Sequence, residues 1–298
     1  MNILFDITLV GIAVSLSCAI IGVFLVLRGS TMVSDAITHT VLLGIVLGFF
    51  ATEDLNSPWL MIGATIVGVL TVYLIEALRN TGLVDNDAAT GIVFPFLFSI
   101  AMILITYFAS DIHLDADAVF TGEIGFTIFN RVNIGGVDLG PEAFWRSVII
   151  FLINTGFVAF FYKELQVTTF DPKYALSIGI PTAFIHYGLM TLTSLTAVGS
   201  FESVGSILVV GLMVGPALTG FLLADKLERV VGIALVTAVF NAVVGVRLAY
   251  MIDLSYAGVI AVVTGVVAFL AFLFSPRKGA LKNLFNRRKQ ERELTKQI

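Results

Sequence analysis

The chain has 298 residues, of which 58% are hydrophobic and 13% are charged. A soluble domain carries about 25% charged residues, so this composition excludes an ordinary soluble enzyme and indicates an integral membrane protein. The formal net charge of −4 hides a basic C-terminus, because eight of the 17 Lys and Arg residues lie in the last 24 residues.

The apolar runs have the length of membrane-spanning helices, about 20 residues each. A β-barrel would instead show short segments of alternating hydrophobicity. The sequence predicts an all-α, polytopic membrane protein with eight or nine spans in one domain over 1–275, followed by a basic tail over 276–298. The nine candidate spans are 5–27, 33–50, 58–77, 88–108, 143–162, 182–200, 204–224, 230–250 and 254–274.

The distribution of charge predicts the orientation of these spans. Several basic residues fall on the same side as the tail, namely Arg28, Arg79, Lys163, Lys173, Lys226 and Arg229, whereas the opposite loops are acidic. By the positive-inside rule the N-terminus faces outward and the tail is cytoplasmic. We interpret the tail as a determinant of topology rather than a nucleic-acid module; contact with anionic lipid is the alternative.

Two other features limit the possibilities. The first span lacks the basic start of a signal peptide, so we expect it to be retained. Cys18 is the single cysteine, which excludes an internal disulfide. The region 109–142 is ambiguous: 118–128 could form a re-entrant or interfacial helix, and 133–137 reads as an exposed turn.

The first candidate for chemistry is the pair Asp35 and His39 at the start of the second span. Residues four apart lie on one face of a helix, and ionisable groups in a membrane segment are costly and usually functional. An oxygen donor beside a nitrogen donor suits a divalent transition metal. Two donors cannot complete a metal site, but a two-fold dimer would double the pair. The topology places Asp35 near the inner end of its span.

The segment 163–181, on the predicted cytoplasmic side, is the second candidate. Asp171 followed by Pro172 is typical of a helix start, and Gly179 marks where that short helix ends. Such a helix at the membrane face would suit docking of a motor protein. A plain helical connector is the alternative.

The third candidate is the small-residue stretch 204–217, which ends in Pro216-Ala217. Small residues permit close helix packing in membranes, and a proline removes a helical hydrogen bond and can mark a kink. These features suit a mobile helix lining a path, and equally suit ordinary tight packing.

Together these segments resemble the permease subunits of the manganese/zinc/iron ABC importers. The similarity is carried by 28–39 with Leu42-Leu43-Gly44, by 87–94, by 170–190 and by 204–217, in the order of that family, over residues 20 to 275. The resemblance implies a metal-coordinating role for Asp35 and His39. It implies that the segment 163–181 docks on the ATPase through Phe170, Asp171, Pro172, Tyr174, Ala175 and Gly179.

The resemblance also implies partners and a location. It implies a second permease subunit, identical or related, two cytoplasmic ABC ATPases, and an extracellular metal-binding protein or lipoprotein, in a bacterial plasma (inner) membrane. The chain has no phosphate-binding loop, so ATP hydrolysis must reside in a partner. No catalytic residue and no permanent cofactor are expected, since the metal is cargo.

Manganese is the favoured metal, on the basis of the hard carboxylate, with zinc and iron(II) as alternatives. Thr38, Thr40 and Leu43 depart from the residues common in the family, and the departure at Leu43 bears on metal identity. Asp111, His113, Asp115 and Asp117 could form a weak outer capture site for metal, or simply a solvated loop. His186 is expected to be a packed or hydrogen-bonded residue.

Alternatives to an ABC permease are an ion-coupled secondary transporter, in which Asp35 would relay an ion, and a membrane scaffold or receptor that uses the tail. An intramembrane metalloenzyme is less favoured, because the chain has no His-Glu-x-x-His motif.

Overall fold

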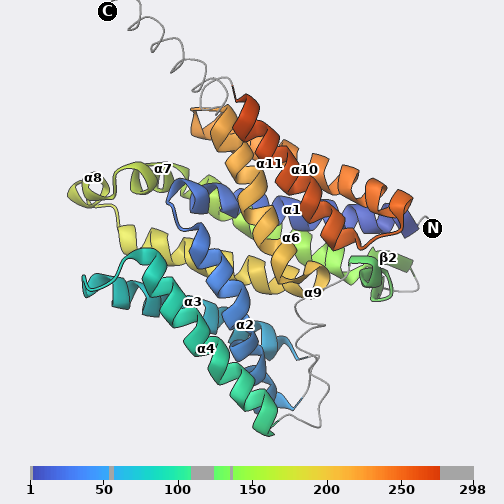
Figure 1. Cartoon of the computed structure of the whole chain (residues 1–298), viewed down its shortest axis with the longest axis horizontal. Helices are drawn as coiled ribbons and strands as arrows, with labels where there is room; N and C mark the ends of the chain where they lie inside the picture. The colour runs from blue at the N-terminus through green and yellow to red at the C-terminus, as the bar shows by residue number, and fades with distance from the viewer. Residues whose placement is uncertain (1–2, 54–56, 109–123, 135–136, 276–298) are drawn as a thin grey trace, which may run out of the picture.

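Long apolar helices make up most of the computed structural model, which describes residues 3–53, 57–108, 124–134 and 137–275 (Figure 1). Eight of the described helices are long and apolar enough to cross a membrane, which confirms the expected helical fold. They are α1 (Ile3–Leu27), α2 (Thr31–Thr52), α3 (Pro58–Asn80), α4 (Asn86–Phe108), α6 (Glu142–Phe160), α9 (Thr182–Leu223), α10 (Leu227–Ile252) and α11 (Tyr256–Phe274). Two shorter helices, α7 (Tyr162–Phe170) and α8 (Pro172–Ser177), connect α6 to α9.

Helix α9 contains two of the nine expected spans. At a rise of 1.5 Å per residue, its 42 residues would extend about 63 Å if straight, roughly twice the hydrocarbon core of a bilayer. Gly205 interrupts it with φ 75° and ψ 164°, a conformation that is essentially restricted to glycine. Figure 1 shows the second half turning back from the first at this point. The break is therefore at Gly205, whereas Pro216 lies inside the second half.

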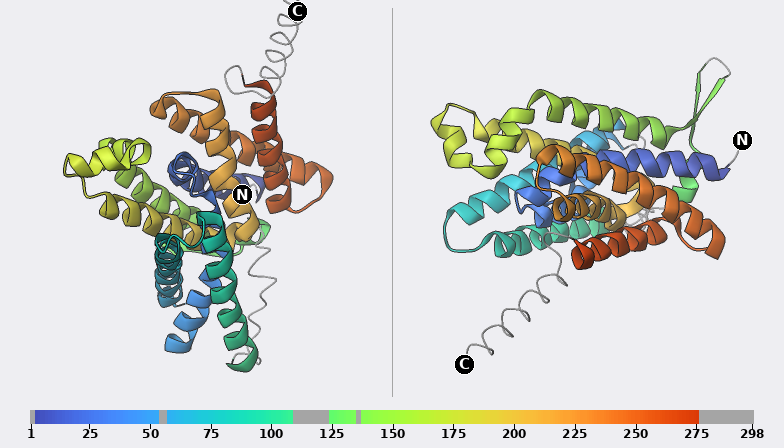
Figure 2. Two further views of the ribbon diagram at one scale, coloured as in Figure 1. Left: turned by 60° about the vertical axis from the view of Figure 1, so that its left-hand side comes forward. Right: turned by 90° about the horizontal axis from the view of Figure 1, so that it is seen from above.

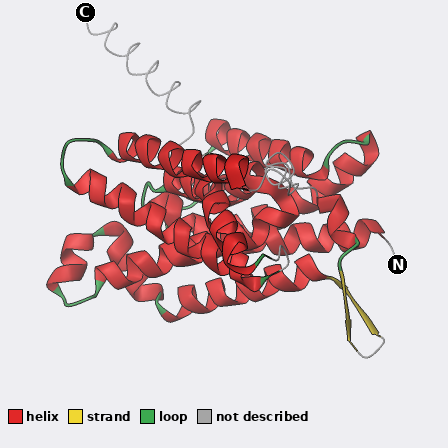
Figure 3. Ribbon diagram, turned by 90° about the horizontal axis from the view of Figure 1, so that it is seen from below, coloured by secondary structure: helices red, strands yellow, loops and turns green. Residues whose placement is uncertain are grey.

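A small hairpin marks the end of the molecule that carries the N-terminus (Figure 3). Strands β1 (Arg131–Ile134) and β2 (Val137–Pro141) pair antiparallel, with Asn133 opposite Asp138. The hairpin is anchored because Arg131 donates to Asp6 of α1 (Nη1–Oδ2, 2.9 Å) and to Asp138 (Nε–Oδ2, 2.7 Å).

The exposed turn expected at 133–137 falls where the chain reverses between the two strands, and its central residues 135–136 lie outside the described part of the chain. Of the helix considered for 118–128, residues 118–123 also lie outside it. The remainder, Ile124–Ile128, forms a 3-10 turn (η1), in which Ile124 is buried.

The helices pack in two groups with separate apolar cores. α1 is largely buried and packs against α6, α9 and α10. Helices α2, α3 and α4 share a second core that includes Leu42, Val67 and Leu97. Figure 2 (left) shows these three helices side by side, extending away from the rest. We call them the α2–α4 group.

Glycines bring α2 and α3 into backbone contact inside this group. A Cβ atom on Gly44 would collide with the backbone of Gly63 and Ala64, and one on Gly63 would lie 2.7 Å from the carbonyl oxygen of Gly44. Small residues at such crossings are typical of membrane helices, where van der Waals packing drives association. The two helices therefore fit closely along this contact.

Candidate metal site

Asp35 and His39 lie one turn apart on the same face of α2. The His39 Nε2 atom is 3.6 Å from Asp35 Oδ1, too long for a hydrogen bond. The Asp35 side chain is 49% exposed and that of His39 is 29% exposed. The carboxylate thus faces away from the chain's own core, although it lies on a membrane-spanning helix.

Aromatic side chains lie close to this pair. The His39 ring centroid lies 5.1 Å from that of Phe94 and 6.4 Å from that of Phe98, both on α4. Among the residues that the structure describes, no group of three or more His, Cys, Asp or Glu side chains could hold a metal. Since metal sites need about four to six donors, the described part of one copy supplies an incomplete site.

The turn that leads into α2 is bound by α7, which bears on the depth of Asp35. In the turn between α1 and α2, Arg28 donates to two threonines of α7, Thr168 (Nη2–Oγ1, 2.8 Å) and Thr169 (Nε–Oγ1, 3.1 Å). Figure 1 shows this turn set inward from α8 and from the turn between α3 and α4. Asp35 is therefore further from that end of the molecule than its position at the start of its span suggests.

Arg28 also belongs to a second group of polar residues that joins four elements. Its Nη1 lies 3.4 Å from His186 Nδ1 in the first turn of α9. The other ring nitrogen of His186, Nε2, lies 2.6 Å from Glu76 Oε1 on α3, and the Tyr187 hydroxyl donates to Glu76 Oε2 at 2.7 Å. We call Arg28, Glu76, Thr168, Thr169, His186 and Tyr187 the inner polar cluster. His186 is thus hydrogen-bonded and packed, as expected.

Sequence reasoning did not single out Glu76, although a signal was present. It is the only charged residue in the expected span 58–77, and an ionisable residue inside a span indicates a functional or paired group. Its partners are more than a hundred residues away in sequence, so no local pattern could identify them. Asp6, buried in α1 and paired with Arg131, was missed for the same reason.

Burial changes the acidity of Arg28. Removal from water disfavours its charged form and lowers the pKa of the guanidinium to about 10. Arg28 therefore remains charged near neutral pH and can donate to several acceptors at once.

The short helix α8 forms as its sequence predicts. The Asp171 Oδ1 atom accepts a hydrogen bond from the Tyr174 N–H at 2.9 Å, and Pro172 occupies the first turn. The chain leaves the helix through Gly179, whose φ is 82°. Ala175 is buried, whereas large apolar side chains on and around α8 are exposed: Phe170, Tyr174, Leu176 and Ile178. Exposed apolar side chains gathered in this way indicate a binding surface.

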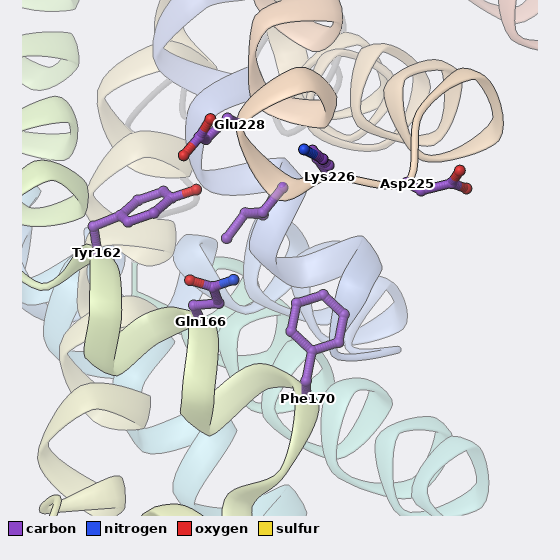
Figure 4. A pocket seen from close by; sticks show the side chains of 7 residues that line it. Tyr162, Gln166, Phe170, Asp225, Lys226 and Glu228 are labelled. Atoms are coloured by element: carbon purple, nitrogen blue, oxygen red, sulfur yellow. The ribbon is translucent and has the colours of Figure 1, made fainter.

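A cavity of about 320 Å³ lies beside this surface, between α7 and the start of α10 (Figure 4). Phe170 lines it, together with Tyr162 and Glu228. Desolvation, followed by the charge of Glu228, raises the pKa of the Tyr162 hydroxyl. The exposed apolar surface of α8 thus continues into a hollow with a polar rim.

The other expected site residues, Asp111, His113, Asp115 and Asp117, lie outside the described residues. The structure therefore leaves the suggested outer capture site as a prediction.

Comparison with known proteins decides the family. The profile of the ABC 3 transport family matches residues 1–275. The chain belongs to the ABC 3 transport family. This permease is 42% identical over 271 residues to the manganese transport system membrane protein MntD of Bacillus subtilis, covering 91% of this chain and 92% of that protein. It is 40% identical over 277 residues to the zinc transport system membrane protein TroD of Treponema pallidum, covering 93% and 75%.

A solved structure shows the same fold. The permease aligns with a chain of PsaBC from Streptococcus pneumoniae, in complex with Fab, with a TM-score of 0.77 and 25% identity, covering 95% of each chain. The protein is therefore a multi-pass membrane permease of an ABC importer for divalent metals and part of an ABC transporter complex. It is a transport subunit rather than an enzyme, which removes the secondary-transporter and scaffold alternatives.

Proposed function

We propose that this permease imports manganese and that Asp35 and His39 coordinate the ion on its way inward. The observation that carries the proposal is the half-exposed carboxylate of Asp35 on a spanning helix. An acid that faced lipid at this position would be costly, so the face that carries it must be covered by protein or line a path.

A second permease subunit, packed against this face of α2, would complete the site. Two-fold symmetry would bring together two carboxylates and two imidazoles, a set of oxygen and nitrogen donors that suits Mn²⁺, Zn²⁺ or Fe²⁺. The carboxylates would offset the cost of stripping water from the cation, and the neutral imidazoles would supply nitrogen. The subunit can be a second copy or a related permease.

The remaining partners follow from the two ends of the molecule. We propose that an ABC ATPase docks on α8 through Phe170 and Tyr174, whose apolar rings are exposed there. A metal-binding protein would deliver the ion at the end that carries the hairpin. The complex would lie in a bacterial plasma membrane with the basic tail in the cytoplasm.

The metal is tested by competition. We expect the reconstituted complex to accumulate Mn²⁺ in proteoliposomes when ATP is supplied, and to retain most of that uptake with equal Zn²⁺ or Fe²⁺ present. The 40% identity to a zinc system makes zinc the serious alternative. Uptake of Zn²⁺ that excludes Mn²⁺ would assign the permease to zinc.

A further inference from the structure

The inner polar cluster lies between the proposed ATPase surface and the helix that carries the proposed metal site. α7 ends at Phe170 and leads through Asp171 directly into α8. Two residues near that end of α7, Thr168 and Thr169, hold Arg28. Arg28 is three residues before Thr31, where α2 begins. Arg28 thus links the α7–α8 segment to the start of α2.

The same cluster holds the neighbouring end of α3. Glu76 lies in the last turns of α3, and it is bound by His186 and Tyr187 at the start of α9. Since α2 and α3 are antiparallel neighbours, Arg28 and Glu76 mark the same end of the α2–α3 pair. The cluster therefore secures both helices at the end nearest to α7 and α8.

The ring of His186 joins the two halves of the cluster. A guanidinium only donates, so His186 Nδ1 accepts from Arg28 and the ring proton is assigned to Nε2, which lies 2.6 Å from Glu76 Oε1. Each ring nitrogen thus lies close to a charged side chain, and the guanidinium is 3.4 Å from Nδ1. A divalent cation at Glu76 and His186 would be repelled by that charge, so the arrangement is not a second metal site.

We propose that Arg28 is a positioning residue that couples movement of α7 and α8 to the α2–α3 pair, and hence to Asp35 and His39. The proposal rests on the docking of an ATPase at α8. Arg28 suits this role because its planar fork of five donors spans three acceptors on two elements, which a lysine cannot do. The cluster transmits a displacement because each of its contacts joins different elements of the fold.

The test uses the complete transporter in proteoliposomes, with the number of Mn²⁺ ions imported per ATP hydrolysed as readout. We expect Arg28→Gln to assemble with the ATPase and hydrolyse ATP, but to import at least tenfold fewer Mn²⁺ ions per ATP. KM for the metal-loaded binding protein should change less than twofold. Arg28→Lys should be intermediate, because it keeps the charge but loses the fork.

Arg229→Gln is the matched control. Arg229 is an exposed guanidinium at the start of α10, on the same side of the membrane by charge distribution. Its loss should leave the ratio of Mn²⁺ to ATP within twofold of the wild type. A residue that merely stabilised the fold would lower the yield of complex and leave this ratio, measured on assembled complex, unchanged.

Two results would overturn the inference. One is a wild-type ratio in assembled Arg28→Gln; the other is loss of the ATPase from that variant, which would make Arg28 part of the docking surface. If Arg28→Gln does not fold, the double variant Thr168→Val with Thr169→Val removes the same hydrogen bonds from the α7 side. A wild-type ratio of Mn²⁺ to ATP in this double variant also overturns the inference. Tyr174→Ala tests docking separately, since retention of the ATPase there would remove the docking proposal itself.

Discussion

The Asp35–His39 pair on α2 and the Glu76–His186 pair between α3 and α9 have the same chemistry but different surroundings. In the first, the closest nitrogen and oxygen are 3.6 Å apart, and the carboxylate side chain is 49% exposed. In the second, they are 2.6 Å apart, the carboxylate is 17% exposed, and Arg28 and Tyr187 add further contacts. The Asp35 carboxylate of the first pair is accessible to a ligand, whereas the Glu76 carboxylate of the second pair is bound by side chains of the fold itself.

The comparison shows that an acid and an imidazole in a membrane segment do not identify a metal site by type alone. The partners decide the role. A carboxylate that several neighbouring side chains bind stabilises the structure, whereas a half-exposed carboxylate on a spanning helix is accessible to cargo. The comparison leads to three predictions, which concern metal affinity first and stability second.

The largest effect is expected from substitutions in the Asp35–His39 pair. Loss of even a residue that supports a metal ligand costs about 10–100-fold in affinity, so Asp35→Asn and His39→Gln should each weaken Mn²⁺ binding by about a hundredfold or more. Equilibrium Mn²⁺ binding to the assembled complex measures this. Glu53→Gln, which removes an exposed carboxylate at the other end of α2, is the control and should bind normally. Normal binding in either test variant would remove the site assignment.

A smaller effect, on stability rather than on metal affinity, is expected from a substitution in the Glu76–His186 pair. Glu76→Gln replaces a charge-assisted hydrogen bond by a neutral one, so we expect the free energy of unfolding to fall by about 2 kcal/mol. Mn²⁺ affinity should stay within twofold. Thermal unfolding in detergent measures the first, with Asp35→Asn as comparison, expected to cost below about 1 kcal/mol. Equal destabilisation by the two variants would erase the distinction between the pairs.

The smallest effect is expected from Tyr187→Phe. This change removes the hydroxyl that donates to Glu76 Oε2 at 2.7 Å and leaves the ring in place. We expect a loss of about 1 kcal/mol of stability, the typical contribution of one hydrogen bond. The loss should be smaller when Glu76→Gln is already present, because the hydroxyl then donates to a neutral acceptor in the same network. Additive losses in the double variant would show that Tyr187 acts elsewhere.

Much of the fold could be predicted from the sequence, because span length and the positive-inside rule are dictated by the bilayer. The cap at Asp171, the end of α8 at Gly179 and the pairing of Asp35 with His39 on one face are local, so residue spacing was sufficient. The break in α9 was placed close to its true position. Its cause, the backbone at Gly205, was not identified, because proline is the more familiar signal.

The inner polar cluster could not be predicted in the same way. In the sequence, Arg28 indicates only topology and nothing marks Glu76 as a partner of Arg28. Their contacts arise only where α1, α3, α7 and α9 converge. The same holds for the bond between Asp6 and Arg131, separated by 125 residues. Long-range pairing between polar groups depends on helix placement, and hydrophobic spacing carries no information about it.

The backbone contact of Gly44 with Gly63 has a mechanical consequence. Two helices that touch at this distance have little room to slide past each other, so we expect α2 and α3 to move together as one rigid unit. A displacement at one end of the α2–α3 pair would then be transmitted to its other end. Gly44→Ala would force α2 and α3 apart at this contact, and the two helices would then no longer tilt together.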